Sequence, residues 1–304
     1  MMARLKGGSS RGKGPNRKDK WYAYAMISPV ILGFLVLLFC PLVYSAYLSL
    51  TDAGMLGSGE FLGLANYQQL FQEDKLFRTV LANTLYFMAG LVPLHITFSL
   101  FMAALLNKNL PGVGVYRTMA FAPVVTSIVV WSIVWKYILA VDYGLVNGFL
   151  VLIGLERVNW FYSDLTMPML IVTTVMKGMG LNMVIFLSAM KSVPRVFYEA
   201  AVIDGASARS SFFHITLPMI SPSIFLGLVT TCIGALKIFG NVYIMTGGGP
   251  ANKTMVIVYY IYKQAFRQNR FGYASAIAMV LFALVLALTL VQWNMRRRMV
   301  YNEV

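Results

Sequence analysis

Side chains that carry out chemistry are scarce in this chain of 304 residues. It has two cysteines and two histidines, and 25 lysines and arginines outnumber its 11 acidic residues. Cys40 and Cys232 both fall inside apolar runs. His95 and His214 are far apart in the sequence, and neither has the closely spaced neighbours that a metal site needs. We therefore expect no metal, no disulfide framework, no catalytic residues and no cofactor.

Charge is scarce as well. Charged residues make up 12% of the chain, against roughly a quarter in soluble domains, and mean hydropathy is +0.70. About 20 helical residues cross the hydrocarbon core of a bilayer. Six apolar runs reach this length, at about 22–50, 79–106, 114–140, 166–190, 220–246 and 272–294. Strict alternation of apolar and polar residues is absent, so we predict an all-α, polytopic membrane protein with six transmembrane helices.

The formal charge of +14 is distributed over the flanks of these runs. Cytoplasmic flanks retain Lys and Arg during insertion, so the basic segment 1–20 and the short tail 296–304 predict that both termini are cytoplasmic. Loop 247–271 does not fit this topology, because it should be external yet has four basic residues and no acid. We rank the N-terminal signal above it. Segment 1–20 is expected to be a disordered tail near anionic membrane lipid, and nucleic-acid binding is not expected.

The glycine-rich segment from Gly247 to Thr254 differs from a Walker A phosphate loop only at Asn252. A phosphate cradle needs a preceding strand, a following helix and free backbone N–H groups. Here a membrane span is expected to precede the loop, and Pro250 removes an N–H group. We therefore predict that the chain has no ATPase of its own.

A polar-to-neutral island at about 191–219 separates two apolar runs, which places it at a membrane surface. Pro194 suits the start of a short helix, and Gly205 is the residue best able to adopt the left-handed conformation that ends it. A second helix is expected over about 207–217, ending at Pro218. On composition alone, the island would be a solvated surface.

The island contains a recognisable motif, Glu199-Ala200-Ala201-Val202-Ile203-Asp204-Gly205-Ala206, with Ile215, Leu217 and Pro218 downstream. This E-A-A-x-x-D-G-A pattern followed by I-x-L-P resembles the EAA loop of bacterial ABC-importer permeases. The resemblance implies that the loop inserts into a cleft on a cytoplasmic ABC ATPase and transmits its closing motion. The coupling residues would then be Glu199, Ala200, Ala201, Asp204, Gly205 and Ala206.

Two further motifs are similar to the sugar-transport, MalF-like branch of these permeases. Lys177 to Met183 matches its W-K-G-x-G-x-N-M segment except for Met176 in place of tryptophan, and Thr246 to Pro250 matches its T-G-G-G-P signature. The acid that usually follows the phenylalanine before this signature is missing, which puts any role of that acid in doubt.

The resemblance implies a permease domain over about 21–295 in the bacterial inner membrane. Its expected partners are a second permease subunit, two copies of a cytoplasmic ATPase, an extracytoplasmic solute-binding protein and a saccharide substrate.

Ionisable residues inside membrane spans are functional hypotheses by default, and the apolar runs contain Lys136, Lys177 and Lys237. Lys136 is close enough to a helix end to reach the interface. Lys237 lies beside a polar stripe in the fifth run. Amides, hydroxyls, charges and aromatic faces bind sugars, so the candidates for the substrate path are Asn182, Lys237, Asn241 and Tyr243. Interhelical polar packing is the alternative for these four residues.

Other functions stay open on the sequence alone. An importer of another small solute, such as glycerol phosphate or a peptide, would differ in the polar lining of its path. A secondary transporter would be expected to show inverted repeats or membrane carboxylates for proton coupling. None of the six apolar runs contains a carboxylate, which favours the ATP-driven class.

Overall fold

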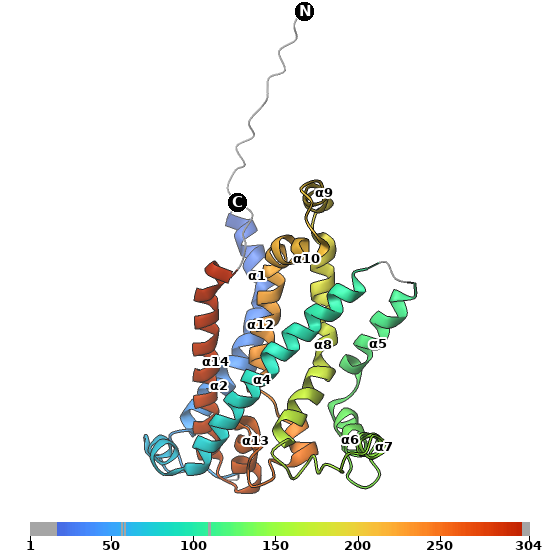
Figure 1. Cartoon of the computed structure of the whole chain (residues 1–304). Coiled ribbons are helices and arrows are strands. Elements are labelled where there is room, and N and C mark those ends of the chain that lie inside the picture. The colour runs from blue at the N-terminus through green and yellow to red at the C-terminus, as the bar shows by residue number, and fades with distance from the viewer. Residues whose placement is uncertain (1–16, 56, 58, 109–110, 300–304) are drawn as a thin grey trace, which may run out of the picture. The chain divides into compact units, whose positions relative to one another are not determined.

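The computed structural model describes residues 17–55, 57, 59–108 and 111–299. Within this described part, every regular element is helical (Figure 1), and one isolated β-bridge joins Thr51 to Phe61. The prediction of an all-α fold is confirmed. The contacts divide the chain into a first unit that ends at Tyr47 and a second that begins at Leu48.

The first unit is essentially one apolar helix. It consists of α1 (Arg17–Phe34), the π-helical turn η1 (Leu35–Phe39) and all but the last residue of α2 (Cys40–Leu48). The stretch Tyr24–Leu48 is long and apolar enough to cross a membrane. The π-helical turn ends two residues before Pro41, where the missing proline N–H would interrupt α-helical bonding. Helix α1 starts at Arg17, before the end of the predicted tail 1–20. Residues 1–16 lie outside the described part, so the tail stays a prediction.

The second unit contains five longer helices and a series of short ones. The longer helices are α4 (Lys75–Leu106), α5 (Val113–Val125), α8 (Thr166–Ser192), α12 (Ser221–Leu236) and α14 (Phe271–Met299). The short elements are α3 (Ala65–Gln68), η2 (Gln69–Glu73), α6 (Ile128–Ile138), α7 (Leu145–Leu152), α9 (Arg195–Ile203), α10 (Ala208–Ser211), η3 (Phe212–Thr216), α11 (Leu217–Met219), η4 (Val242–Thr246), α13 (Ile257–Tyr262) and η5 (Lys263–Arg267).

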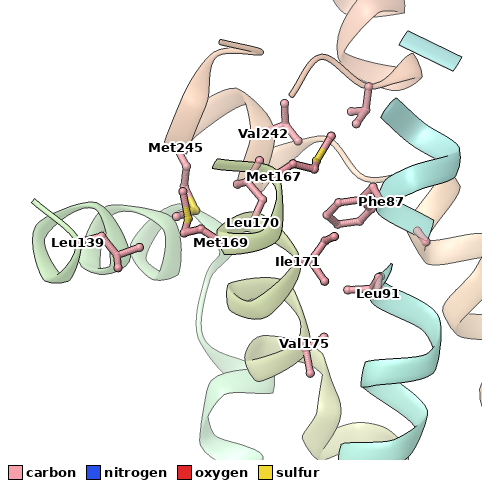
Figure 2. Packing of buried hydrophobic residues seen from close by; sticks show 12 residues of the cluster. Phe87, Leu91, Leu139, Met167, Met169, Leu170, Ile171, Val175, Val242 and Met245 are labelled. Carbon is pink, nitrogen blue, oxygen red and sulfur yellow. The ribbon is translucent and has the colours of Figure 1, made fainter. Parts of the chain in front are cut away.

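The centre of this unit is the pair α4 and α8, where apolar side chains interlock (Figure 2). Phe87 and Leu91 of α4 pack with Leu170 and Ile171 of α8, and all four are at most 4% exposed. A second buried cluster joins the start of α4 to α13 and α14. A third joins the far ends of α4 and α8 to the segment that follows α9. The core therefore runs the full length of the α4–α8 pair.

The described part has four continuous helices long and apolar enough to cross a membrane, or six spans if two bent helix pairs each count as one. The third predicted span, 114–140, is not straight, because α5 and α6 meet at 103°. Thr126 between them is extended, and Ser127 caps the start of α6 with its side chain.

The fifth predicted span, 220–246, is also wrong in its bounds. Helix α12 ends at Leu236, and a non-helical stretch separates it from η4. On its other side, α12 is bent by 67° from the segment Ala208–Met219. The apolar composition of the run predicted a membrane span, but it did not reveal where the helix stops.

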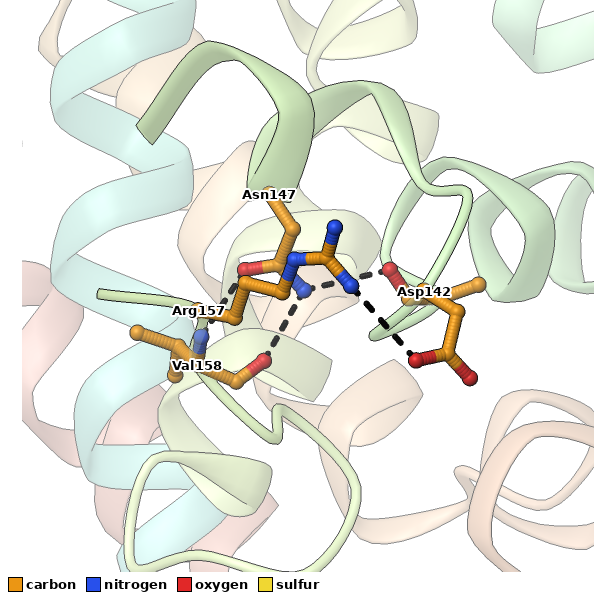
Figure 3. Close-up of polar contacts among 5 residues, drawn as sticks. Asp142, Asn147, Arg157 and Val158 are labelled. Carbon is orange, nitrogen blue, oxygen red and sulfur yellow. Dashed lines mark hydrogen bonds and ion pairs between the residues drawn. The ribbon is translucent and has the colours of Figure 1, made fainter. Parts of the chain in front are cut away.

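The two ends of the second unit carry different elements (Figure 1). Helices α9 and α10 lie at one end, whereas α6, α7 and α13 lie at the other. At the latter end, buried Asn147 of α7 holds the loops around it, donating to the carbonyls of Ala140 at 3.1 Å and Val158 at 3.0 Å and accepting from the Val158 N–H at 2.9 Å (Figure 3). An exposed ion pair between Arg157 and Asp142, 3.6 Å long, lies beside these hydrogen bonds of Asn147.

Candidate functional site

The motif predicted for coupling forms α9 and the turn that ends it. Asp204 is the C-cap residue, and Gly205 follows with φ +75°. The Gly205 N–H donates to the Val202 carbonyl at 3.1 Å, and the Ala206 N–H donates to the Ala201 carbonyl at 2.8 Å. These two bonds define a Schellman motif. The D-G-A half of the sequence motif is therefore a helix stop, and Gly205 supplies the left-handed residue that the stop requires.

The other half of the motif lies on an exposed surface of α9. Glu199, Ala200, Asp204 and Gly205 are exposed, whereas Ala201 and Ala206 are partly covered. The apolar side chains of α9 are also open: Val196 is 69% exposed and Ile203 85%. Residues 196, 199, 200 and 203 share one face of a helix. A free face that combines apolar groups with a carboxylate is typical of a protein-binding helix.

The segment after α9 fixes this helix to the rest of the second unit. Tyr198 of α9 shares a hydrogen bond with Thr216, 2.8 Å long, and Phe212 packs against the third buried cluster. The predicted end of the second helix at Pro218 is wrong, since the helical segment continues to Met219. The π-helical turn η3 directly precedes α11 and relieves the missing proline N–H.

Two of the four predicted path residues are buried between helices. Asn182 of α8 is 3% exposed, and its amide nitrogen lies 3.2 Å from the His95 ring of α4 and 3.0 Å from the Thr231 hydroxyl of α12. Asn241 is 1% exposed and donates to the Thr174 hydroxyl at 2.7 Å. These contacts match the packing alternative, in which polar side chains join helices inside the membrane.

The other two path residues are exposed. Lys237 is the C-cap residue of α12 and lies at the end of the helix rather than within a span. Tyr243 is 39% exposed and stacks on Phe239 with the ring centroids 5.3 Å apart and the planes at 11°. Tyr259 and Tyr262 of α13 complete the group, each within 6.3 Å of a neighbouring ring. We call Phe239, Tyr243, Tyr259 and Tyr262 the aromatic cluster.

The glycine-rich loop has no phosphate cradle. The N–H groups of Gly247, Gly248 and Gly249 are all used inside the loop, by the carbonyls of Val242 and Thr246 and the Thr246 hydroxyl. The Thr254 hydroxyl donates to the Gly249 carbonyl at 2.6 Å. A cradle needs free N–H groups at a helix start. In this loop the N–H groups instead form hydrogen bonds that stabilise the loop itself.

Lys253 of the same loop forms an exposed ion pair with Asp164, 2.6 Å long, and this contact lowers the pKa of the Asp164 carboxyl. The pair places the basic loop 247–271 next to the segment that precedes α8. The basic loop 247–271, whose charge does not fit an external position, thus lies on the same side as the loop that contains Asp164, whose charge does fit one.

Sequence reasoning left Lys177 unassigned and missed Tyr259 and Tyr262. The lysine had a signal, since it is a charge near the middle of an apolar run. The tyrosines had none that separates them from other aromatic residues near a membrane surface. Only the folding of α13 against η4 brings them together with Tyr243.

A bundle of apolar, partly broken helices with an exposed E-A-A-x-x-D-G-A helix at one end is typical of importer permeases. Residues 95–301 match the family described as "Binding-protein-dependent transport system inner membrane component". The chain belongs to this family. It is therefore a multi-pass inner membrane protein, the non-catalytic transmembrane component of an ABC importer.

Known relatives resemble the chain over nearly its whole length. The lactose transport system permease protein LacF of Rhizobium radiobacter is 36% identical, with 90% of this chain and 93% of LacF covered. The sn-glycerol-3-phosphate transport system permease protein UgpA of Yersinia pestis bv. Antiqua (strain Antiqua) is 30% identical, with 94% and 97% covered. A solved bacterial ABC transporter, described as importing the acidic polysaccharide alginate, superimposes with a TM-score of 0.81 at 26% identity, covering 93% of this chain and 98% of that one.

Proposed function

We propose that this permease conducts a saccharide and couples to ATP hydrolysis through α9. It pairs with a second permease subunit, contacts one of two cytoplasmic ATPase subunits and receives its cargo from an extracytoplasmic solute-binding protein. The end that carries α9 then faces the cytoplasm, and so do both termini. The main observation in favour of the coupling role is that α9 has an exposed face and ends in a Schellman motif at Gly205.

The geometry of α9 supports its role as a contact helix. Ala200 has a small side chain, so a partner backbone can approach closely, while Val196 and Ile203 supply apolar contact area on the same face. Glu199 has no hydrogen-bond partner among the described residues and is free to meet a basic group. Helix α8 ends at Ser192 and α9 begins at Arg195, so a push on α9 is delivered directly to a membrane-spanning helix.

Two substitutions test the coupling role. Gly205→Pro removes the left-handed turn, since proline holds φ near −65°, and Glu199→Lys reverses the charge of the contact face. Co-purification with the ATPase and substrate uptake should both fall in each variant. Uptake should fall on the order of tenfold or more, within the usual range of coupling between two sites.

The control is Gly154→Pro, which alters another left-handed glycine, φ +81°, outside the α9 segment. It should leave ATPase binding intact. Normal ATPase recovery together with normal uptake in Gly205→Pro and Glu199→Lys would refute the role of α9.

The aromatic cluster supports a saccharide as cargo. Tyrosine combines an apolar ring with a hydroxyl, which suits a sugar that has C–H faces and hydroxyl groups. Lys237 and Tyr243 are exposed between α12 and α13 and are the path residues that we retain as substrate contacts. Asn182 and Asn241 stay as candidates only if a conformational change releases them from their present partners.

The competing cargo is a small phosphate ester, because a relative of comparable coverage is a glycerol-3-phosphate permease. A phosphate would require cationic groups, and the path candidates include one lysine and no arginine. Uptake assays with the reconstituted importer, comparing oligosaccharides with glycerol 3-phosphate, distinguish the two. Transport of the phosphate ester alone would overturn the saccharide proposal and leave the coupling role standing.

A further inference from the structure

Lys177 lies near the middle of the membrane-spanning helix α8 and is only partly exposed. Its ammonium group donates to the carbonyl of Thr126 at 2.6 Å and to that of Pro123 at 3.0 Å. None of the candidate membrane spans contains Asp or Glu. The only described acceptors of this charge are therefore two backbone carbonyls, both from the break between α5 and α6.

That break leaves carbonyl groups in need of donors. Helix α5 ends at Val125, and the last carbonyls of a helix lack α-helical partners. Among the described residues, the Thr126 carbonyl accepts from no backbone N–H, and the Pro123 carbonyl has one backbone donor, the Thr126 N–H at 3.3 Å. The peptide dipoles of a helix also sum to a partial negative charge at this end. Backbone groups at membrane depth must be satisfied within the protein. An ammonium group from the neighbouring helix meets both needs, as a donor and as a positive charge.

The elbow between α5 and α6 is held against α8 on several sides. A Cβ added at Gly180 would lie 2.4 Å from the Ala120 carbonyl oxygen, so α5 touches the α8 backbone there. On the α6 side, the Trp131 ring N–H donates to the Thr173 carbonyl at 3.1 Å. Lys177 lies on α8 between Thr173 and Gly180, and its side chain reaches the carbonyls of Pro123 and Thr126.

We propose that Lys177 is the positioning residue of this elbow, a covalently attached cation that occupies the carbonyl end of α5. In ion-coupled transporters, the carbonyl ends of broken helices hold a free cation such as Na⁺. Here the lysine takes that place, and the elbow keeps its 103° bend without a bound ion. The proposal rests on the proposed function in one respect: α8 continues into α9, so Lys177 links the coupling helix to the elbow.

Spin labels test the elbow directly in the assembled importer. Cysteines replace Val115 of α5 and Tyr137 of α6, which are 63% and 62% exposed, in a background that lacks Cys40 and Cys232. The wild-type distance distribution should be narrow. Lys177→Met removes two hydrogen bonds from a charged group. It should broaden or shift the distribution and reduce uptake per assembled complex by at least about tenfold, the effect expected for the loss of one such bond. Lys177→Arg keeps the charge and should restore both.

The matched control is Lys136→Met, which removes an exposed lysine of α6 that has no hydrogen bond or ion pair among the described residues. It should leave the distances unchanged. An unchanged distribution in Lys177→Met, or one that Lys177→Arg does not restore, would overturn the proposal even if the thermal stability of the complex falls. The distance measurement reports on the elbow whatever the cargo, so its failure is separate from failure of ATPase binding or saccharide uptake.

Discussion

At the scale of single residues, the four path candidates separate by their surroundings rather than by their chemistry. Asn182 and Asn241 are buried with hydrogen-bond partners from neighbouring helices, whereas Lys237 and Tyr243 are open. The sequence shows the same kinds of polar groups in both pairs. Their roles are expected to differ because a buried amide that loses its partners costs stability, while an open side chain is free to meet a ligand.

Lys237→Met should therefore leave the thermal stability of the complex nearly unchanged, within about 0.5 kcal/mol. Tyr243→Leu should lower it by about 0.5–1.5 kcal/mol, because it also removes the stacking on Phe239. Substrate-stimulated ATP hydrolysis should fall by roughly tenfold, the effect expected when an aromatic or charged anchor is truncated. Asn182→Ala is the contrasting variant. It should lower stability by about 1–3 kcal/mol, because His95 and Thr231 lose a buried partner. Stability loss in Lys237→Met with normal stimulation would reassign Lys237 to packing.

At the scale of elements, a proline does not by itself decide whether a helical segment continues or turns. Pro41 and Pro218 each follow a π-helical turn, and the helical segment continues past both. Near Pro123, in contrast, the chain turns by 103°. The difference lies in what surrounds the break: α8 supplies Lys177 to the carbonyls there, and no local sequence pattern contains that contact.

The starts of three helices meet at one carboxylate. Asp74 caps α4 by accepting from the Phe77 N–H at 2.9 Å, and it accepts from the Tyr260 hydroxyl of α13 and the Tyr273 hydroxyl of α14, both at 2.6 Å. Burial raises the pKa of the Asp74 carboxyl, but these hydrogen bonds outweigh it and hold the pKa below its usual value. Asp74 therefore joins α4, α13 and α14 in its ionised form.

Asp74→Asn should lower stability at neutral pH by about 1–3 kcal/mol, the range for hydrogen bonds to a charged group. Because the folded pKa lies below the unfolded one, this contribution is complete above the unfolded carboxyl pKa and is lost as pH falls through the folded value. Thermal unfolding of the purified protein at pH 7 and at progressively lower pH should show wild type approaching the variant. A constant difference across this range would contradict the assignment.

Tyr260→Phe serves as the graded control. It removes one of the two tyrosine donors and leaves the cap of α4 in place, so its loss of stability should be smaller than that of Asp74→Asn. An equal loss would show that the Tyr260 hydroxyl, which also accepts from the Gln264 amide at 2.7 Å, accounts for most of the stabilisation at this position.

At the scale of the whole molecule, the structure shows which loops lie at the same end of the second unit, and which end faces the cytoplasm stays a prediction. The ion pair of Lys253 and Asp164 joins two loops predicted to be external. Arg209 lies in α10, at the opposite end of the second unit (Figure 1). The basic loop 247–271 therefore shares a side with Asp164.

Cysteine labelling in intact cells tests this orientation. Positions 60, 164 and 253 should react with a membrane-impermeant reagent, and positions 18, 209 and 297 should react only after the membrane is opened. External reaction at position 209 would contradict both the topology and the docking role of α9.

The sequence by itself determined what depends on neighbouring residues. The apolar runs predicted the membrane-spanning, all-α class, and Gly205 predicted the end of α9 because a helix stop is encoded within a few residues. Only the tertiary structure decided which polar residues are buried, where α5 and α12 end, and which partners Lys177 and Asp74 find. Those contacts join residues 51 to 199 positions apart, and a membrane excludes the water that would otherwise satisfy such groups, so the packing of helices decides each of them.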